Sequence, residues 1–151
     1  MVAERILESV TGERLVIQHS TPDLLRFERH LPPKQRPAPK VAHPTQEARL
    51  KVLEGRLHAT VGEQKQDYRA GESFTVPEGT FHSAHNLEAQ PARMLVEFRP
   101  ADGLLAFFED MMGLTSMNLL AVVRVVKHHR DAVRLAAPYA QIVGLLGVLL
   151  R

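Results

Sequence analysis

The sequence contains no cysteine, which excludes disulfides, thiolate metal sites and a cysteine nucleophile, and which fits a reducing compartment. It has no block of lysine and arginine, and its formal net charge is only +2, so nucleic-acid binding is not expected. A G-x-S-x-G nucleophile setting, a glycine-rich phosphate loop and an H-E-x-x-H motif are also absent. These absences remove the common hydrolase, nucleotide-binding and metalloprotease classes.

Residues 1–5 lack the cationic start and apolar run of a secretory signal, so we expect a cytoplasmic protein. At 151 residues, with 44% hydrophobic and 24% charged residues, the chain suits a globular protein with one sizeable core.

The first hundred residues predict a series of short strands separated by turn residues. Four segments are apolar at alternate positions or rich in β-branched residues: 15–17, 25–31, 73–76 and 92–99. A strand pair that breaks at Glu54-Gly55 includes Leu50, Val52 and Leu57, and a hairpin joins residues 57–61 to 64–68. Gly62 and Ala70-Gly71 mark turns between them. Residues 32–44 hold five prolines, which predicts an extended loop and excludes a helix or a central strand. The regular spacing favours a sandwich or barrel.

After Pro100 the pattern becomes helical. We expect one helix from Leu104 to Met112, capped by Asp102 and ended by Gly113. A second helix, capped by Ser116, is expected to run through Val133, and a third segment follows from Pro138. The predicted organisation is a barrel over residues 1–100 and a helical extension over residues 101–151. Strands followed by helices, without alternation, disfavour doubly wound folds.

Two motifs carry the chemistry. Gly71, Pro77, Gly79, His82 and Asn86 match G-x5-P-x-G-x2-H-x3-N at every defined position. Upstream, residues 39–55 contain a histidine at 43, an apolar strand and a closing glycine at 55, similar to the later part of H-x-H-x3or4-E-x6-G.

These are the two motifs of the cupin superfamily, and residues 31–100 resemble small single-domain bacterial cupins. The resemblance implies a mainly-β, double-stranded β-helix (jelly-roll) barrel, here with two or three C-terminal helices, and it makes a homodimer the default assembly. It also implies a metal held by three imidazoles and one carboxylate.

This chain departs from that ligand set. Val41 stands where the first motif histidine would fall, and Ala48 stands where its glutamate would fall. Neither side chain offers a lone pair to a divalent Fe, Mn, Zn, Ni or Cu ion. His43 and His82 remain at matching positions, which makes the metal site incomplete.

Two residues are candidates to complete it. Glu47 follows His43 at a spacing that a looser form of the motif allows, but period two turns it to the side opposite Ala48 unless a bulge intervenes. His85 lies three residues after His82 and is expected on the opposite side of the strand. The favoured interpretation is that no metal binds and that His43 and His82 are hydrogen-bonding groups lining a ligand pocket, or remnants of the metal site.

The other histidines are interpreted as structural. His128 and His129 on the second helix are expected to point about 100° apart, which predicts that they cannot face one ligand. His19, His30 and His58 stand alone, as surface or edge residues.

The uncharged residues 135–150 number sixteen, fewer than the ~20 that span a bilayer. Residues 115–151 carry five lysines and arginines against one acid, which would suit an anionic membrane surface. Packing of this tail on the barrel or on a partner subunit is favoured over membrane contact. Phe107, Phe108, Met111 and Met112 would suit a dimer contact or a lid.

Three functions follow from the sequence. The leading hypothesis is a barrel that binds a small organic ligand between His43 and His82. The first alternative is an enzyme, either a metal-dependent oxygenase using His43, His82 and Glu47 or a metal-free isomerase or cyclase with a histidine base. The second alternative is a membrane-peripheral or assembly module working through the tail.

Overall fold

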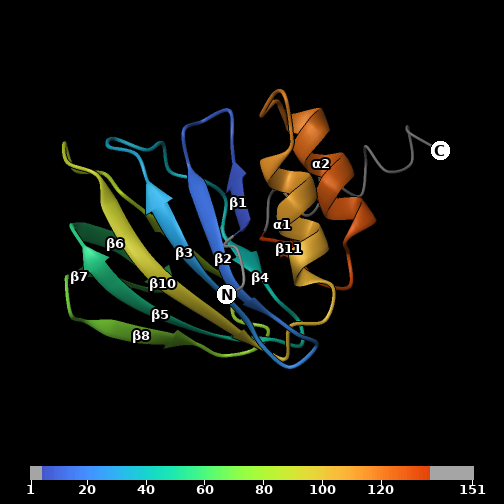
Figure 1. The fold of residues 1–151 in the computed structure, drawn as a ribbon, viewed down its shortest axis with the longest axis horizontal. Helices are drawn as coiled ribbons and strands as arrows, with labels where there is room; N and C mark the ends of the chain where they lie inside the picture. The colour runs from blue at the N-terminus through green and yellow to red at the C-terminus, as the bar shows by residue number, and fades with distance from the viewer. Residues whose placement is uncertain (1–4, 137–151) are drawn as a thin grey trace.

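The computed structural model describes residues 5–136 as two antiparallel sheets with two helices at one end (Figure 1). The first sheet, in the order β1-β2-β3-β10-β5-β8, contains β1 (Arg5–Glu8), β2 (Arg14–Ser20), β3 (Leu25–Leu31), β10 (Ala92–Arg99), β5 (Glu47–Glu54) and β8 (Ser73–Val76). The second, in the order β11-β4-β9-β6-β7, contains β11 (Arg134–Leu135), β4 (Val41–Ala42), β9 (His82–His85), β6 (Arg56–Val61) and β7 (Gln64–Arg69).

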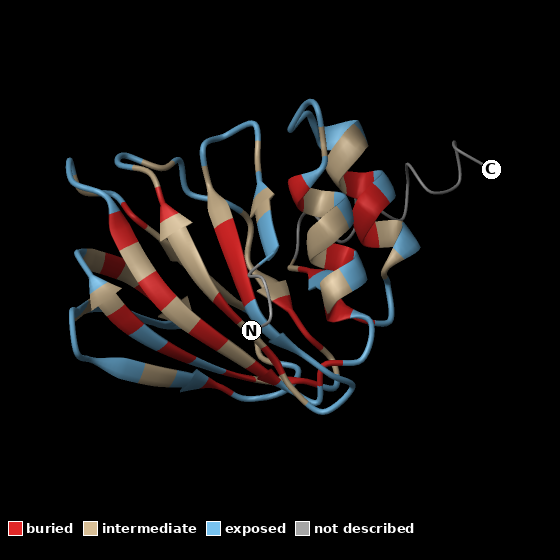
Figure 2. Cartoon of the chain, viewed as in Figure 1, coloured by how far each residue is buried: buried red, intermediate tan, exposed pale blue. Residues whose placement is uncertain are grey.

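The mainly-β, double-stranded barrel with C-terminal helices is thereby confirmed. The strands that line the core, such as β5 and β10, form where apolar residues alternate, because successive side chains point to opposite faces of a sheet. Along β10, four alternate residues are buried, and Figure 2 shows this alternation along the strand. Strand β3 pairs with β10 so that Phe27 lies opposite Val96. The bounds predicted for β3, β8 and β10 agree with the structure. The inward residues of both sheets form one apolar core.

The turns also follow the prediction. Gly62 lies between β6 and β7 with a φ of 61°, and Gly71 lies before β8 with a φ of 92°, conformations that glycine adopts without strain. Gly55 has a further constraint, because a Cβ atom there would lie 2.7 Å from the carbonyl oxygen of Pro91. The closing glycine of the first motif therefore permits the close approach of two chain segments.

The prediction that residues 32–44 form only a loop is wrong in part. Val41 and Ala42 form β4, which lies between β9 and β11 inside the second sheet. The five prolines lie outside this dipeptide, so its backbone N–H groups remain available for pairing. A two-residue strand is too short to show a period of its own.

The first helix, α1 (Leu104–Met112), has the predicted bounds but not the predicted cap. Its N-cap is Gly103, in a left-handed conformation and with no side-chain hydrogen bond, rather than Asp102. Aromatic packing holds α1 to the barrel: the Phe108 ring lies 5.1 Å from Phe27 and 5.8 Å from Phe98, between centroids. Phe107, also on α1, lies in the hydrophobic core, and Phe108 packs against it.

The second helix, α2 (Leu119–His128), is shorter than predicted. Asn118 caps it by accepting a hydrogen bond from the backbone of Ala121, while Ser116 hydrogen-bonds to Asn118 instead of capping. The chain leaves the helix after His128 and turns into β11, which pairs with β4. The predicted continuation of the helix to Val133 is therefore wrong, and the segment from Pro138 lies outside the described residues. No helix within residues 5–136 has the length and apolar character needed to cross a membrane.

Candidate functional site

His43 lies just after β4, on the interior side of the barrel, and only 5% of its surface is exposed. Its Nδ1 atom lies 2.8 Å from the carbonyl oxygen of Ala132, in the turn that follows α2. The ring also packs edge-on against Phe98, with centroids 5.0 Å apart, and near Phe107 at 6.5 Å. The helical extension thus covers this histidine and contacts its ring directly.

His82 begins β9 and is brought to His43 by strand pairing, because it lies opposite Val41, two residues before His43. Its Nδ1 atom lies 3.1 Å from the carbonyl oxygen of Thr80. The centroids of the two imidazole rings are 5.5 Å apart. The turn at Gly79 links the same two segments, since its backbone N–H donates to the carbonyl oxygen of His43 at 2.8 Å.

Both rings have a defined tautomer. A carbonyl oxygen only accepts hydrogen bonds, so Nδ1 must donate in each ring, and a neutral imidazole then carries its lone pair on Nε2. The interior therefore offers two neutral acceptor nitrogens from rings that are 5.5 Å apart. This arrangement is held by backbone carbonyls on both sides.

Burial keeps these rings neutral. It lowers the pKa of His43 from 6.5 to about 4; the Ala132 carbonyl opposes this change, and the nearby His82 adds to it. Burial also lowers the pKa of His82, against the effect of the Thr80 carbonyl and with a contribution from the charge of Arg29. Both imidazoles are therefore uncharged at neutral pH.

The positions expected to hold the other metal ligands are apolar in the structure. Ala48 is 2% exposed and faces the interior, and Val41 is half-buried beside His82. Glu47 lies on the outer side of β5, where its carboxylate accepts a hydrogen bond from Arg49 at 3.1 Å and its side chain is 46% exposed. The structure brings His43 and His82 together but does not bring Glu47 to them.

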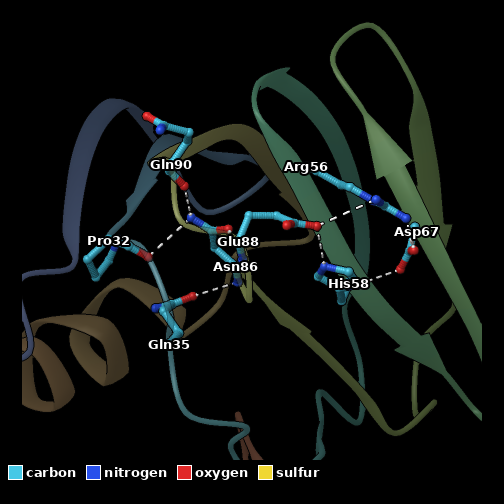
Figure 3. A network of polar contacts seen from close by, with 8 residues as sticks. All are labelled: Pro32, Gln35, Arg56, His58, Asp67, Asn86, Glu88 and Gln90. Carbon is cyan, nitrogen blue, oxygen red and sulfur yellow. Dashed lines mark hydrogen bonds and ion pairs between the residues drawn. The ribbon is translucent and has the colours of Figure 1, made fainter.

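His85 lies opposite His58 on the side of β9 that faces away from His82. Its Nε2 atom accepts a hydrogen bond from the backbone N–H of Ala38, which ties the proline-rich segment to the sheet. The sequence suggested that His58 stands alone, but its ring nitrogens contact Asp67 and Glu88. Both of these carboxylates also pair with Arg56 (Figure 3). The Arg56 guanidinium holds the pKa of Asp67 below its ordinary value, with a smaller contribution from His58.

Asn86, the last residue of the second motif, has a structural role (Figure 3). Its side chain is fully buried; the amide nitrogen donates to the carbonyl oxygens of Pro32 and Gln90, and the amide oxygen accepts from the backbone of Glu88. The backbone N–H of Asn86 also donates to Gln35. The residue therefore joins the start of the proline-rich segment to the loop after β9.

Sequence reasoning missed two features of this region. The first is the carbonyl of Ala132, which orients His43 from 89 positions away and has no side-chain signal. The second is Gln46, which is 2% exposed and donates to the carbonyl oxygen of Asp102 while its own Oε1 has no hydrogen-bond partner among the described residues. Gln46 lies two residues before Ala48 and shares its inward side at period two, but a polar side chain does not add to the apolar pattern that marks this side of the strand.

The prediction that His128 and His129 cannot face one ligand is wrong. His129 is the C-cap that follows the last helical residue, and its φ of −108° and ψ of 32° are not helical, so the helical rotation between the two residues does not apply. Their ring centroids are 4.8 Å apart, and the His129 ring contacts Asp110.

Comparison with known proteins identifies the barrel. The family model described as a cupin domain matches residues 27–98. These residues form a cupin domain. No curated protein matches the chain in sequence.

Solved structures agree with this fold. KdgF from Halomonas sp. is 20% identical, with a TM-score of 0.57 over 67% of this chain and 90% of that protein. An RmlC-like cupin from Shewanella frigidimarina is 20% identical, with a TM-score of 0.57 over 68% of this chain and 88% of that protein. A sugar phosphate isomerase of the cupin superfamily from Silicibacter pomeroyi is 19% identical, with a TM-score of 0.54 over 59% of this chain and 60% of that protein.

The donor set of this cupin domain does not fit the metal centre that the family resemblance implies. Two imidazoles remain of the four expected ligands, because Val41 and Ala48 cannot coordinate and Glu47 lies on the outer face. The two histidines therefore offer two neutral hydrogen-bond acceptors inside the barrel, and the charge of Arg29 acts on one of them, His82.

Proposed function

We propose that this cupin domain binds a small organic ligand between His43 and His82, without a metal. The observation that carries the proposal is the pair of neutral imidazoles, whose Nδ1 atoms are occupied by the carbonyls of Ala132 and Thr80. A ligand then meets the Nε2 lone pairs, which accept hydrogen bonds.

The chemistry of the surroundings narrows the ligand class. Two acceptors call for a ligand with two donors, such as hydroxyl or N–H groups, because a buried polar group without a partner costs free energy. The rings of Phe98 and Phe107 beside His43 favour an apolar or flat body between those donors. The proposed ligand is therefore an organic molecule with at least two hydroxyl or N–H groups and an apolar or flat body between them.

Binding is favoured over acid–base catalysis for His43. A general base works best with a pKa near the working pH, and the pKa of His43 lies at about 4. His82 keeps the alternative of a metal-free isomerase or cyclase open, since it is neutral and less buried than His43. In that alternative, His82 Nε2 would take a proton from the bound ligand.

The test is a ligand-observed NMR screen of neutral diols, sugars and amides, each matched with its O-methylated or N-methylated analogue. We expect donor-bearing compounds to bind and their methylated analogues to fail. The variants His43→Asn and His82→Asn should each weaken the hits, while substitution of the exposed His19 should not. Hits of unchanged affinity in both interior variants would show that these histidines do not anchor the ligand.

A further inference from the structure

A second group of histidines lies outside the barrel, between the two helices. Asp110 lies in the last turn of α1, His128 is the last residue of α2 and His129 follows it. One potential ligand atom from each residue lies within 4.8 Å of the others. Within residues 5–136 this is the one group of three or more histidine, cysteine or acidic side chains that meets this condition.

We propose that Asp110, His128 and His129 bind a divalent transition-metal ion, with Zn²⁺ as the ion that suits them best. Two imidazole nitrogens and a carboxylate oxygen are donors that Zn²⁺ takes in tetrahedral sites, with a fourth position left for water. The Nε2 atom of His129 already lies 2.6 Å from Oδ2 of Asp110, a contact that a bridging ion would replace with two coordinate bonds.

The geometry needs only small adjustments. Ligand atoms about 2.0–2.2 Å from a tetrahedral zinc ion are separated by roughly 3.4 Å. Atoms up to 4.8 Å apart must therefore close by about 1.4 Å at most, and the pair of His129 and Asp110, at 2.6 Å, must open by about 0.8 Å. Asp110 and His128 are exposed, so their side chains border solvent and have room to adjust. His129 is the fixed member, because its side chain is 11% exposed and its ring packs edge-on against Phe107 at 5.9 Å between centroids.

The surrounding charge decides which ions qualify. Arg124, Lys127, Arg130 and Asp131 line, with His128, a cavity of about 530 Å³ beside the group. Three cationic side chains and one acid give this cavity a net positive charge, which repels a metal cation. Water and salt weaken this repulsion at an exposed site. Hard ions such as Mg²⁺ and Ca²⁺, which prefer oxygen ligands, are therefore disfavoured. An ion bound directly by imidazole nitrogens is the type that this site accepts.

The ion would join α1 to the end of α2 and so stabilise the turn that contacts the barrel. The carbonyl oxygen of His129 accepts hydrogen bonds from the backbone of Ala132 at 2.9 Å and Val133 at 3.0 Å. Ala132 in turn accepts the Nδ1 hydrogen of His43. A metal at this surface site therefore supports the orientation of His43 from outside the barrel, whether or not the barrel binds the proposed ligand.

The test uses the full-length, untagged protein after removal of metals with a chelator. We expect calorimetric titration with ZnCl₂ to show one ion per chain and a higher melting temperature with zinc, while Mg²⁺ and Ca²⁺ give neither result. His128→Ala and Asp110→Asn should each weaken zinc binding by more than roughly 10–100-fold. That is the loss typical of mutating a residue that only hydrogen-bonds to a metal ligand, whereas these two residues would bind the ion directly. Both residues are exposed, so the zinc-free melting temperatures should stay close to that of the unchanged protein.

The variant His82→Ala separates this site from the barrel. We expect it to bind zinc with unchanged affinity, because His82 does not belong to the group. Absence of zinc binding in the unchanged protein would overturn the proposal. Zinc binding that survives in His128→Ala and is lost in His82→Ala would place the ion inside the barrel and would overturn it as well.

Discussion

The stability of this protein should fall on acidification because of His43, and the size of the effect follows from its burial. Its pKa lies at about 4 in the folded chain and at 6.5 in the unfolded chain. Between these values the unfolded chain binds a proton that the folded chain excludes, so protonation stabilises the unfolded state. The free energy of unfolding therefore has its full value above pH 6.5, as far as His43 is concerned, and decreases progressively as the pH falls to about 4.

The magnitude comes from the same two values. At about 1.4 kcal/mol for each tenfold change in proton affinity, the full loss is about 3 kcal/mol, of which about 2 kcal/mol should be lost by pH 5. This is a large share of the 5–15 kcal/mol that typically stabilises a folded domain (order of magnitude).

The assay is urea unfolding at several pH values between 7.5 and 4.5, for the unchanged protein and for His43→Asn. The asparagine amide nitrogen can replace Nδ1 as a donor to Ala132 but does not titrate in this range. The variant will have its own stability at pH 7.5, so the decisive quantity is the further loss on acidification. We expect that loss to be about 2 kcal/mol smaller in the variant at pH 5.

His19→Asn provides the control, because it makes the same substitution at an exposed histidine on β2 and leaves the buried His43 in place. Its loss on acidification should match that of the unchanged protein. Equal slopes for the unchanged protein and for His43→Asn would refute the reasoning, since they would mean that His43 is as easily protonated in the folded chain as in the unfolded one.

Three further predictions test the barrel itself. The double variant Val41→His and Ala48→Glu should bind one more equivalent of divalent metal than the unchanged protein by elemental analysis, because both positions lie on the inner side with His82; no added metal would contradict this register. Gly55→Ala should lower the free energy of unfolding, measured in urea, by about 1–3 kcal/mol more than Gly62→Ala. Both glycines have a positive φ, but only a Cβ atom at Gly55 would contact a backbone atom, the Pro91 carbonyl oxygen at 2.7 Å. Asn86→Ala should cost about 3 kcal/mol by the same assay, at about 1 kcal/mol for each of its three side-chain hydrogen bonds, and a near-neutral result would mean that water replaces them.

The long strands and the first helix could be predicted because each repeats its pattern several times. Strand β10 alternates over eight residues, and α1 ends at a glycine as expected. Strands β4 and β11 have two residues each, so no period exists to find, and their pairing depends on how α2 ends. The position of Glu47 on the outer face also followed from counting back from Gly55.

The candidate site could be predicted only to the level of residue identity. The motif spacing pointed to His43 and His82, and strand pairing brings them together. The tautomers, the low pKa of His43 and its burial depend on Ala132, a residue whose contribution is a backbone carbonyl. Any amino acid supplies that group, so no sequence pattern could have indicated it.

The helical extension is part of the environment of His43 and more than a surface addition. In a metal-binding histidine, a hydrogen bond to the nitrogen that does not bind the metal fixes the tautomer and the ring orientation. Here the Ala132 carbonyl makes that hydrogen bond to Nδ1 although the positions for two of the ligands are Val41 and Ala48. The extension therefore holds His43 in a defined orientation, with Nε2 as its acceptor, without relying on a metal. This is the physical reason to treat the turn after α2, together with the two histidines, as one binding unit.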